Sequence, residues 1–298
     1  MVIKISKDKF TYRFSKDVPP AAYAKAGDVV VFEVMDNLSD QIKSEDIPLE
    51  AIDISKRNPS TGPLYIEGVE AGDTLVVDVL DIKVGSKGWI RVFPGGGALH
   101  DKKFEPKIKI VNIVNGYVIF NDLKIPIKPM VGTIGVTPSD AEIPTVMCGP
   151  HGGNMDLKII RKGARVYFPV FVDGGLLAMG DLHAVQSDGE SGITPIEVDG
   201  EVIVKVDVIK GRKPRYPVIE LEDTYSIITS GVDLDEAVYK AVDEAVNTLM
   251  KAFNTSFQEA YMLSSMLVEL RINQVVNPLK GVRAEISKSY VSINDILR

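Results

Sequence analysis

The strongest constraint on the fold is a change of hydrophobic period near residue 230. From residue 1 to about 230, short runs of β-branched and apolar residues are separated by Gly, Asp and Pro, a pattern typical of strands joined by turns. After Ser230, apolar residues recur every three or four positions from Leu234 to Phe253, which is the period of an amphipathic helix. The sequence therefore predicts an α+β fold, with a β-rich sandwich or barrel-like body followed by a C-terminal helical pair.

The C-terminal pattern also predicts where these helices begin and end. Asp233 is placed to cap the first helix. The second helix is expected from Phe257 to about Asn273, because Thr255 and Gln258 have the spacing of a capping box.

The remaining C-terminal residues are expected to return to the sheet as strands. We expect these strands at 281–287 and at 290–293. Residues 1–230 are then the β-rich body that carries the functional site, and residues 231–298 are the helical pair and closing strands packed on it.

The body contains a faint internal repeat. Ala26-Gly27-Asp28 precedes the run VVVFEVMD, and Ala71-Gly72-Asp73 precedes TLVVDVLD. Residues 163–173 repeat the shape more loosely. Such repeats fit a sandwich or barrel assembled from similar hairpins.

Composition argues against several classes of partner. The chain has 41 acidic and 34 basic residues and a net charge of −7, so it lacks the clustered cations that bind nucleic acid. No apolar run approaches the roughly 18 residues needed to span a bilayer, and the N-terminus lacks the apolar stretch of a signal peptide. The single cysteine, Cys148, excludes an internal disulfide and suits a reducing compartment. We expect a soluble, cytoplasmic protein with no nucleic-acid or membrane partner.

The residues best suited to chemistry lie in MGDLHAVQSDGE. Asp181 and His183 are two positions apart on a strand-like run, so both face one side of it. Ser187-Asp188-Gly189 then predicts a turn that brings Glu190 back toward them. Zinc binds imidazole nitrogen and carboxylate oxygen, while calcium and magnesium prefer oxygen. This segment therefore indicates either a metal or acid/base site, or a structural turn held by hydrogen bonds.

A second glycine-rich loop, CGPHGGNMD, places His151, Asn154 and Asp156 within six positions. The glycines between them let the backbone approach a ligand closely, although glycine pairs also form ordinary turns. A functional role requires this loop to meet the 181–190 segment in space.

Three other features suggest weaker possibilities. Cys148 has the chemistry of a nucleophile, but a lone cysteine is more often a small buried hydrophobic residue. His100 follows Gly95-Gly96-Gly97 without the Gly-Lys-Ser/Thr of a P-loop, which favours a flexible loop at the rim of a site over phosphate binding. Asp36 ends an apolar strand, where a chain either reaches solvent or contributes to a site.

These motifs together resemble the acetamidase/formamidase family. The resemblance extends through nearly the whole chain, in GDVVVFEVMDNLSDQI, NPSTGPLYIEG, HGGNMD, MGDLHAVQSDGE and AYMLSSMLVELRINQVVNP. The chain departs from the family pattern at Ser187, where the family usually has Gly. Strain at that position is expected if its φ is positive.

The resemblance implies metal-dependent hydrolysis of short-chain aliphatic amides, such as acetamide and formamide, to a carboxylate and ammonia. It implies zinc at the active site, with calcium as the alternative. The metal-site residues carried over are Asp36, His151, Asp156, Asp181 and His183.

The same resemblance suggests roles for the remaining polar groups. Glu190 is expected to be the general acid/base, and His183 to be catalytic as well as a ligand. A mechanism built on these acids and histidines adds a hypothesis of its own, in which the developing oxyanion is held by Asn154, by Gln186 or by the backbone N–H groups of Gly152 and Gly153.

Two other interpretations remain open. One is a metal-free amidase that uses Cys148 as its nucleophile, and the other is a non-catalytic β-rich scaffold whose carboxylates hold a structural calcium. Apolar residues on the second helix further predict a homodimer or a higher even oligomer. These residues are Tyr261, Met262, Met266 and Leu267.

Overall fold

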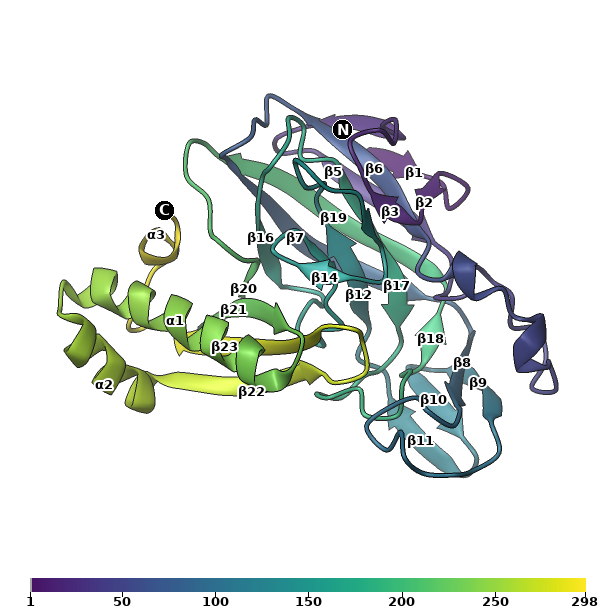
Figure 1. The fold of residues 1–298 in the computed structure, drawn as a ribbon. Helices are drawn as coiled ribbons and strands as arrows, with labels where there is room; N and C mark the ends of the chain where they lie inside the picture. Colours follow the sequence, from purple (N-terminus) through teal and green to yellow (C-terminus); the bar gives the residue numbers. More distant parts are fainter. Residues whose placement is uncertain (1) are drawn as a thin grey trace.

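Two large β-sheets form most of the molecule (Figure 1), and the computed structural model describes residues 2–298. The first sheet has nine strands, in the spatial order β1 (Val2–Ile5), β5 (Val29–Val34), β19 (Gly200–Ile209), β7 (Thr74–Val84), β16 (Arg165–Pro169), β20 (Val218–Glu220), β21 (Thr224–Gly231), β23 (Lys280–Ser287) and β22 (Val268–Gln274). β1 and β5 run parallel, and the other neighbouring pairs are antiparallel. Short turns suffice to connect antiparallel strands, in agreement with the strand and turn pattern of the sequence.

The second sheet has twelve strands. Its main path runs β11 (Leu123–Pro126), β10 (Tyr117–Phe120), β9 (Lys107–Val114), β8 (Lys87–Val92), β18 (Glu197–Val198), β17 (Leu177–His183), β12 (Met130–Gly135), β15 (Gly152–Asn154) and β14 (Cys148–Gly149). β6 (Ser60–Glu67) also pairs with β17 and carries β2 (Phe10–Thr11) and β4 (Ala22–Lys25). A separate pair joins β3 (Arg13–Phe14) to β13 (Ile143–Pro144), and two short 3₁₀ turns lie at Leu49–Ala51 and Ile54–Lys56.

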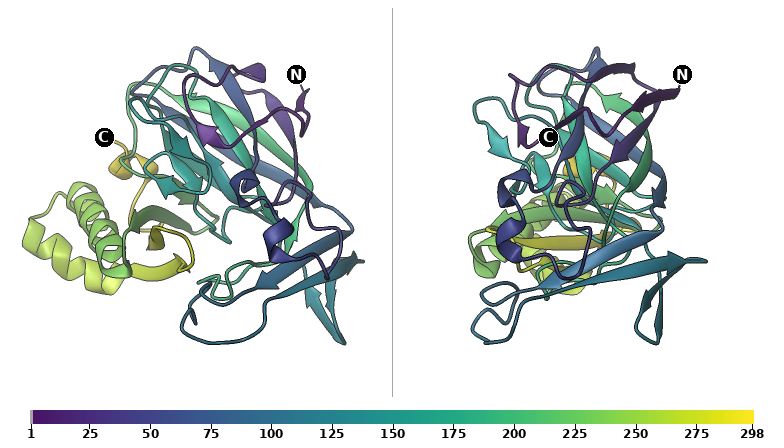
Figure 2. Two further views of the ribbon diagram at one scale, coloured as in Figure 1. Left: turned by 45° about the vertical axis from the view of Figure 1, so that its right-hand side comes forward. Right: turned by 90° about the vertical axis from the view of Figure 1, so that its right-hand side faces the viewer.

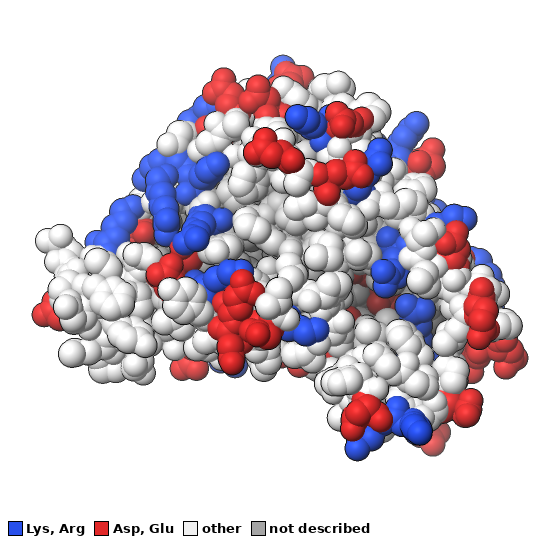
Figure 3. Space-filling model, in the orientation of Figure 1, with Lys and Arg blue, Asp and Glu red and all other residues white. Residues whose placement is uncertain are grey.

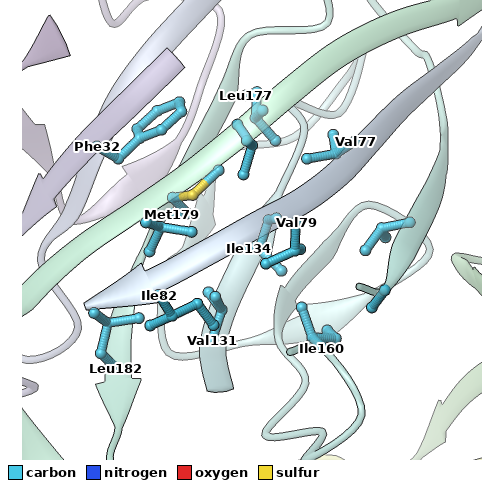
Figure 4. Close-up of a cluster of buried hydrophobic side chains, with 14 of the residues drawn as sticks. Phe32, Val77, Val79, Ile82, Val131, Ile134, Ile160, Leu177, Met179 and Leu182 are labelled. Atoms are coloured by element: carbon cyan, nitrogen blue, oxygen red, sulfur yellow. The ribbon is translucent and has the colours of Figure 1, made fainter. Parts of the chain in front are cut away.

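The main hydrophobic core combines side chains from both large sheets (Figure 4). Phe32 and Val77 come from the first sheet, and Leu177 and Met179 from the second. β12 and β17 are buried along their whole length, as is typical of strands covered on both faces. Polar residues at the end of β17 are therefore held in a rigid, water-poor setting.

The predicted internal repeat corresponds to equivalent positions in one sheet. β5 and β7 lie on either side of β19, and both pair with it antiparallel. Each is preceded by a turn with a glycine at positive φ, 93° at Gly27 and 103° at Gly72. In each turn the aspartate accepts a hydrogen bond of 2.8 Å from the backbone N–H three residues earlier, at Asp28 and at Asp73.

The helical pair follows the strands, as predicted. α1 (Leu234–Phe253) is capped by Asp233, whose side chain accepts from the N–H of Glu236. α1 covers one face of β21 and β23 with a buried row of small residues that lets the backbones approach closely. This row consists of Ala237, Ala241 and Ala245.

The second helix is shorter than predicted. α2 (Phe257–Leu267) is capped by Ser256 and Glu259, one position after the predicted pair Thr255 and Gln258. The chain then enters β22 directly, because residues 268–274 pair with β23. A helix to Asn273 was therefore wrong.

The strand predicted at 281–287 is confirmed as β23, but the one at 290–293 is wrong. Ser292 and Asp295 form a capping box there, which starts the one-turn helix α3 (Ile293–Ile296). The α+β class of a β-rich body with C-terminal helices is correct.

The helices lie at one end of the molecule, and β9, β10 and β11 lie at another (Figures 1 and 2). The first sheet also includes strands that follow residue 230 in the sequence, because β23, at residues 280–287, pairs with β21. None of the helices within residues 2–298 is long and apolar enough to cross a membrane.

Candidate active site

A cavity of about 350 Å³ brings the two predicted site segments together. Asp156 comes from the CGPHGGNMD loop, and Asp181 and Glu190 come from the MGDLHAVQSDGE segment. All three line the cavity. A fourth acid, Glu197 on β18, lines it as well. All four acids are buried. The condition set by the sequence, that loops near 156 and 190 share one pocket, is met.

Three of the buried side chains are spaced to share one ion. One oxygen each of Asp156 and Asp181 and one ring nitrogen of His183 lie within 4.8 Å of one another. Asp181 and His183 come from the end of β17, and Asp156 follows β15. The predicted common face of Asp181 and His183 is present, since His183 Nε2 lies 3.3 Å from Asp181 Oδ1.

Three of these acids have a strained backbone. Asp156, Asp181 and Glu190 have φ values of 43°, 59° and 46°. Such left-handed conformations are uncommon outside glycine, and they cluster at functional sites because the surrounding structure must enforce them. Ser187 is not among the residues in 2–298 with positive φ, so the departure from the family's glycine introduces no strain of this kind.

Two amide donors and a nearby hydroxyl surround Asp181. Asn37 Nδ2 donates to Oδ1 at 2.9 Å and Asn58 Nδ2 to Oδ2 at 2.8 Å. Thr133 Oγ1 lies 3.3 Å from the same Oδ2. Burial raises the pKa of Asp181, but the attraction and hydrogen bond of His183, together with the hydrogen bond from Asn37, outweigh it, so the net pKa is lowered. Asp181 is therefore an ionised acceptor.

Gln186 fixes the tautomer of His183. Gln186 Nε2 donates to the backbone oxygen of Asp156 at 2.7 Å, so its Oε1 faces His183 Nδ1, also at 2.7 Å. Nδ1 therefore carries the hydrogen, and the Nε2 lone pair points toward Asp181 and Glu197, each 3.3 Å away. A lone pair facing two carboxylates requires a cation between them, either a proton or a metal ion.

The other acids keep oxygen atoms without partners. Asp156 Oδ1, Glu190 Oε2 and Glu197 Oε2 are buried and have no hydrogen-bond partner. Burial, followed by the charge of Asp181, raises the pKa of Asp156 to about 7. Burial raises the pKa of Glu197 to about 8, although His183 opposes the shift. Such atoms beside an imidazole nitrogen fit a divalent cation.

Glu190 has a similarly perturbed environment. Burial raises its pKa well above the usual range, and the charge of Asp156 adds to the shift. A buried carboxyl with a free oxygen in a cavity has the properties of an acid/base group.

Two of the five predicted ligands lie outside the group formed by Asp156, Asp181 and His183. Asp36 Oδ2 accepts from Trp89 Nε1 at 2.9 Å, and Oδ1 accepts from the N–H groups of Leu38 and Asp40, also at 2.9 Å. His151 is buried with its ring edge against Phe14, and neither ring nitrogen has a hydrogen-bond partner. Burial lowers the pKa of His151 to about 4. Their roles as ligands stay predictions.

The predicted oxyanion donors also differ in position. Asn154 lines the cavity, and its Oδ1 accepts from Thr133 at 2.8 Å, which leaves its amide N–H groups for a ligand. Gln186 does not line the cavity, and its amide contacts His183 and the backbone oxygen of Asp156. Gly152 and Gly153 pair with β12, and a Cβ on Gly152 would lie 2.4 Å from Ile134 O, so packing accounts for that glycine. Among the candidates, the geometry favours Asn154.

Several groups at the site were missed from the sequence. Glu197 stands in an otherwise apolar run, ITPIEV, and an acid there was a usable signal. Asn37, Asn58 and Asn277 lie within the motifs that carry the family resemblance. Gly132 gave no signal, yet a Cβ on it would lie 2.7 Å from Asp181 Oδ2 and 2.8 Å from Asp156 Oδ1.

The C-terminal hairpin supplies one wall of the cavity. Asn277, in the loop between β22 and β23, donates to Asp156 Oδ2. The Gly189 N–H donates to Asn273 O at 2.8 Å. Arg283 is buried on β23 and donates two bonds of 2.9 Å to Asp188, so it ties the turn before Glu190 to this hairpin.

The weaker sequence candidates lie at the edge of the site or away from it. His100 and the three glycines line a neighbouring hollow that shares Phe93, Ile193, Val276 and Lys280 with the cavity, as expected for a loop at the rim. Cys148 is buried and does not line the cavity, and burial raises the pKa of its thiol to about 11. A thiol in this state is a poor nucleophile.

Comparison with known proteins places the chain in a family. A family model described as the acetamidase/formamidase family matches residues 3–147 and 142–282. The chain belongs to this family. A curated formamidase from Methylophilus methylotrophus is 28% identical to it over 316 residues, which cover 79% of this chain and 77% of the relative.

Two solved members of the acetamidase/formamidase family have nearly the same fold. One is a predicted acetamidase/formamidase from Thermoanaerobacter tengcongensis, with 41% identity, a TM-score of 0.94 and coverage of 97% of this chain and 98% of that one. The other is an acetamidase from Bacillus halodurans, with 39% identity, a TM-score of 0.95 and coverage of 99% of both chains.

Proposed function

We propose that this chain hydrolyses short linear amides to a carboxylate and ammonia, using a divalent metal ion held by Asp156, Asp181 and His183. The observation that carries the metal is the spacing of these three ligand atoms, all within 4.8 Å. Curated relatives named formamidase and acetamidase support the reaction.

The ligand set favours zinc. One imidazole nitrogen and two carboxylate oxygens match the three protein ligands of a catalytic zinc site, which leaves one position open. Imidazole suits zinc better than calcium, which prefers oxygen ligands throughout. Calcium is the alternative.

When bound, a divalent ion polarises a carbonyl oxygen and lowers the pKa of water. The residues of the chain do the rest. Asn154 directs its amide N–H groups toward the substrate oxygen. Glu190 accepts a proton from the attacking water at its free Oε2 and delivers it to the departing nitrogen, a role typically worth about 10²–10⁴ in rate. Gln186 keeps the imidazole lone pair of His183 directed at the ion.

The test is ammonia release from amides of one to four carbons, measured after chelation and after adding zinc or calcium. We expect chelation to abolish turnover and zinc to restore it. A Glu190→Gln variant should bind the metal but lose at least about a hundredfold in kcat. Full activity after verified metal removal would contradict the metal-dependent mechanism. If chelation instead lowered the melting temperature and no amide were ever turned over, the sites would be structural.

We also propose that the chain forms a homodimer or a higher even oligomer through α2. Tyr261, Met262 and Met266 are 54%, 68% and 70% exposed. The surface over α1 and α2, at the left of Figure 3, shows few charged side chains. Light scattering of the wild type and of Met266→Lys tests this assignment.

A further inference from the structure

Arg91 is a buried cation in the wall of the catalytic cavity. It lies on β8, is 8% exposed, and lines the same cavity as the acids. Its guanidinium lies 5.9 Å from the ring centroid of Trp89 and 5.2 Å from that of Phe93. Asp36 holds Trp89 in place by accepting from its indole N–H at 2.9 Å. The guanidinium of Arg91 thus lies over the rings of Trp89 and Phe93, and the hydrogen bond to Asp36 fixes the ring of Trp89.

Within the described residues, the guanidinium of Arg91 makes no direct polar contact, although the charge of Glu197 acts on it from beyond hydrogen-bonding distance. Within residues 2–298 it makes no hydrogen bond, and no carboxylate oxygen lies within 4.0 Å of it. The other well-buried arginine behaves differently, since Arg283 bonds to Asp188, Asn273 and Glu285. Burying a charge without a partner is costly, so an unpaired arginine facing a cavity indicates an anionic ligand.

The cavity is also larger than the smallest amides require. Its volume of about 350 Å³ is in the range of pockets that bind ligands of many atoms, whereas acetamide has only four non-hydrogen atoms. Two further cations, Arg57 and Lys280, line it. The four acids gather around His183, so the cavity has an acidic catalytic part and a cationic wall.

We infer that Arg91 binds a carboxylate at the far end of the acyl chain, so that the preferred substrates are short amides that carry a carboxylate. The planar guanidinium offers paired donors that match a carboxylate, and the aromatic rings hold it in a fixed plane. This inference rests on the proposed hydrolysis and specifies its substrate class.

The test compares succinamate with succinamide on the zinc-loaded enzyme. The two molecules have the same size, but succinamide replaces the carboxylate by a neutral amide. We expect kcat/KM to be at least about tenfold higher for succinamate, since bonds to a charged group are worth one to two powers of ten. Arg91→Met should reduce this ratio about ten- to a hundredfold, and Arg91→Lys should restore part of it.

A matched control is Arg57→Met, which removes an exposed cation from the same cavity. Its succinamate to succinamide ratio should change less than about threefold, because solvent screens an exposed charge. Calorimetric binding of succinate should likewise weaken in Arg91→Met, and melting curves establish that each variant is folded.

Three results would overturn the inference. The first is a wild-type ratio of kcat/KM for succinamate to that for succinamide near one. The second is an equal loss of kcat/KM on both substrates in Arg91→Met. The third is a change of this ratio in Arg57→Met as large as that in Arg91→Met. Failure of the proposed metal mechanism gives a different result, namely turnover that survives chelation whatever the substrate preference.

Discussion

The Oε1 atom of Gln186 lies 2.7 Å from Nδ1 of His183, and the other end of the same amide is tied to the backbone of Asp156. One side chain therefore orients His183 on β17 against the segment that carries Asp156, and both residues are proposed above as ligands. Partners of this kind typically contribute 10- to 100-fold to metal affinity.

We expect Gln186→Leu to lower zinc affinity by about that factor, measured by competition with a chelator of known affinity. Gln258→Leu, on the exposed surface of α2, is the control and should bind zinc like the wild type. Unchanged affinity in Gln186→Leu would remove the orienting role.

Gly132 keeps space for the acid pair. An alanine Cβ at this position would lie 2.7 Å from Asp181 Oδ2 and 2.8 Å from Asp156 Oδ1, closer than normal contact. We expect Gly132→Ala to lower zinc affinity at least about tenfold, because the carboxylates must separate. Gly192→Ala is the matched control, since nothing lies within 4 Å of its Cβ position. Equal zinc affinities of Gly132→Ala and Gly192→Ala would contradict the expected clash between the added Cβ and the two carboxylates.

Arg283 and Lys158 both pair with Asp188, but their burial differs. The side chain of Arg283 is 2% exposed and that of Lys158 is 40% exposed. We expect Arg283→Met to reduce the free energy of unfolding by about 3 kcal/mol, because a partly buried carboxylate loses its main partner. Lys158→Met should cost less than about 1 kcal/mol, since solvent screens that pair. Urea unfolding measures the free energy of unfolding of both variants. An equal loss in the two variants would show that burial does not determine the contribution of these ion pairs.

The buried acids predict how pH affects metal binding. Without metal, the pKa of Asp156 is about 7 and that of Glu197 about 8, both raised above their unfolded values. The pKa of His183 is also raised, because Glu197 and Asp181 outweigh the effect of its burial. Raised pKa values stabilise the metal-free fold most below the unfolded values of 3.8 and 4.5, and this contribution is lost progressively as the pH rises from there to the folded values of about 7 and 8.

In the proposed site, zinc would have to displace those protons, so its stabilising effect should grow as the pH rises toward the folded pKa values of about 7 and 8. We expect the difference in melting temperature between zinc-loaded and chelated protein to be larger at pH 8 than at pH 5.5. His151, whose pKa is lowered to about 4, destabilises the fold at acid pH, but it lies outside the three-residue group and should affect both forms equally. A difference that shrank toward pH 8 would contradict this assignment.

Cys148 is expected to have no catalytic role. Its thiol is buried outside the cavity with a pKa raised to about 11, so little thiolate forms at neutral pH. We expect Cys148→Ala to keep kcat within about threefold of wild type in the ammonia assay. Loss of turnover in a variant that still melts normally would revive the metal-free mechanism.

The sequence predicted local features well where one principle dominates. The cap at Asp233 and the turn that returns Glu190 were recoverable because both depend on neighbouring residues. The end of α2 was missed because residues 268–274 gain more from pairing with β23 than from continuing the helix.

The site was predicted only in part for a similar reason. Asp181, His183 and Asp156 stand in conspicuous motifs, but the engagement of Asp36 by Trp89 depends on a neighbour 53 positions away. The contribution of Gly132 is a matter of available space, which residue type alone does not reveal. Arg91 had no motif, and only the three-dimensional structure shows that its guanidinium makes no hydrogen bond within residues 2–298.

The loop between β22 and β23 contains Asn277, whose side chain donates a hydrogen bond to Asp156. This contact affects how the protein loses activity on heating. This hairpin is at the edge of its sheet, where strands separate most easily. Fraying there would open the pocket while the central strands stayed intact. On heating, the protein should therefore lose activity at a temperature below that at which the whole molecule unfolds. Brief cooling should restore this activity.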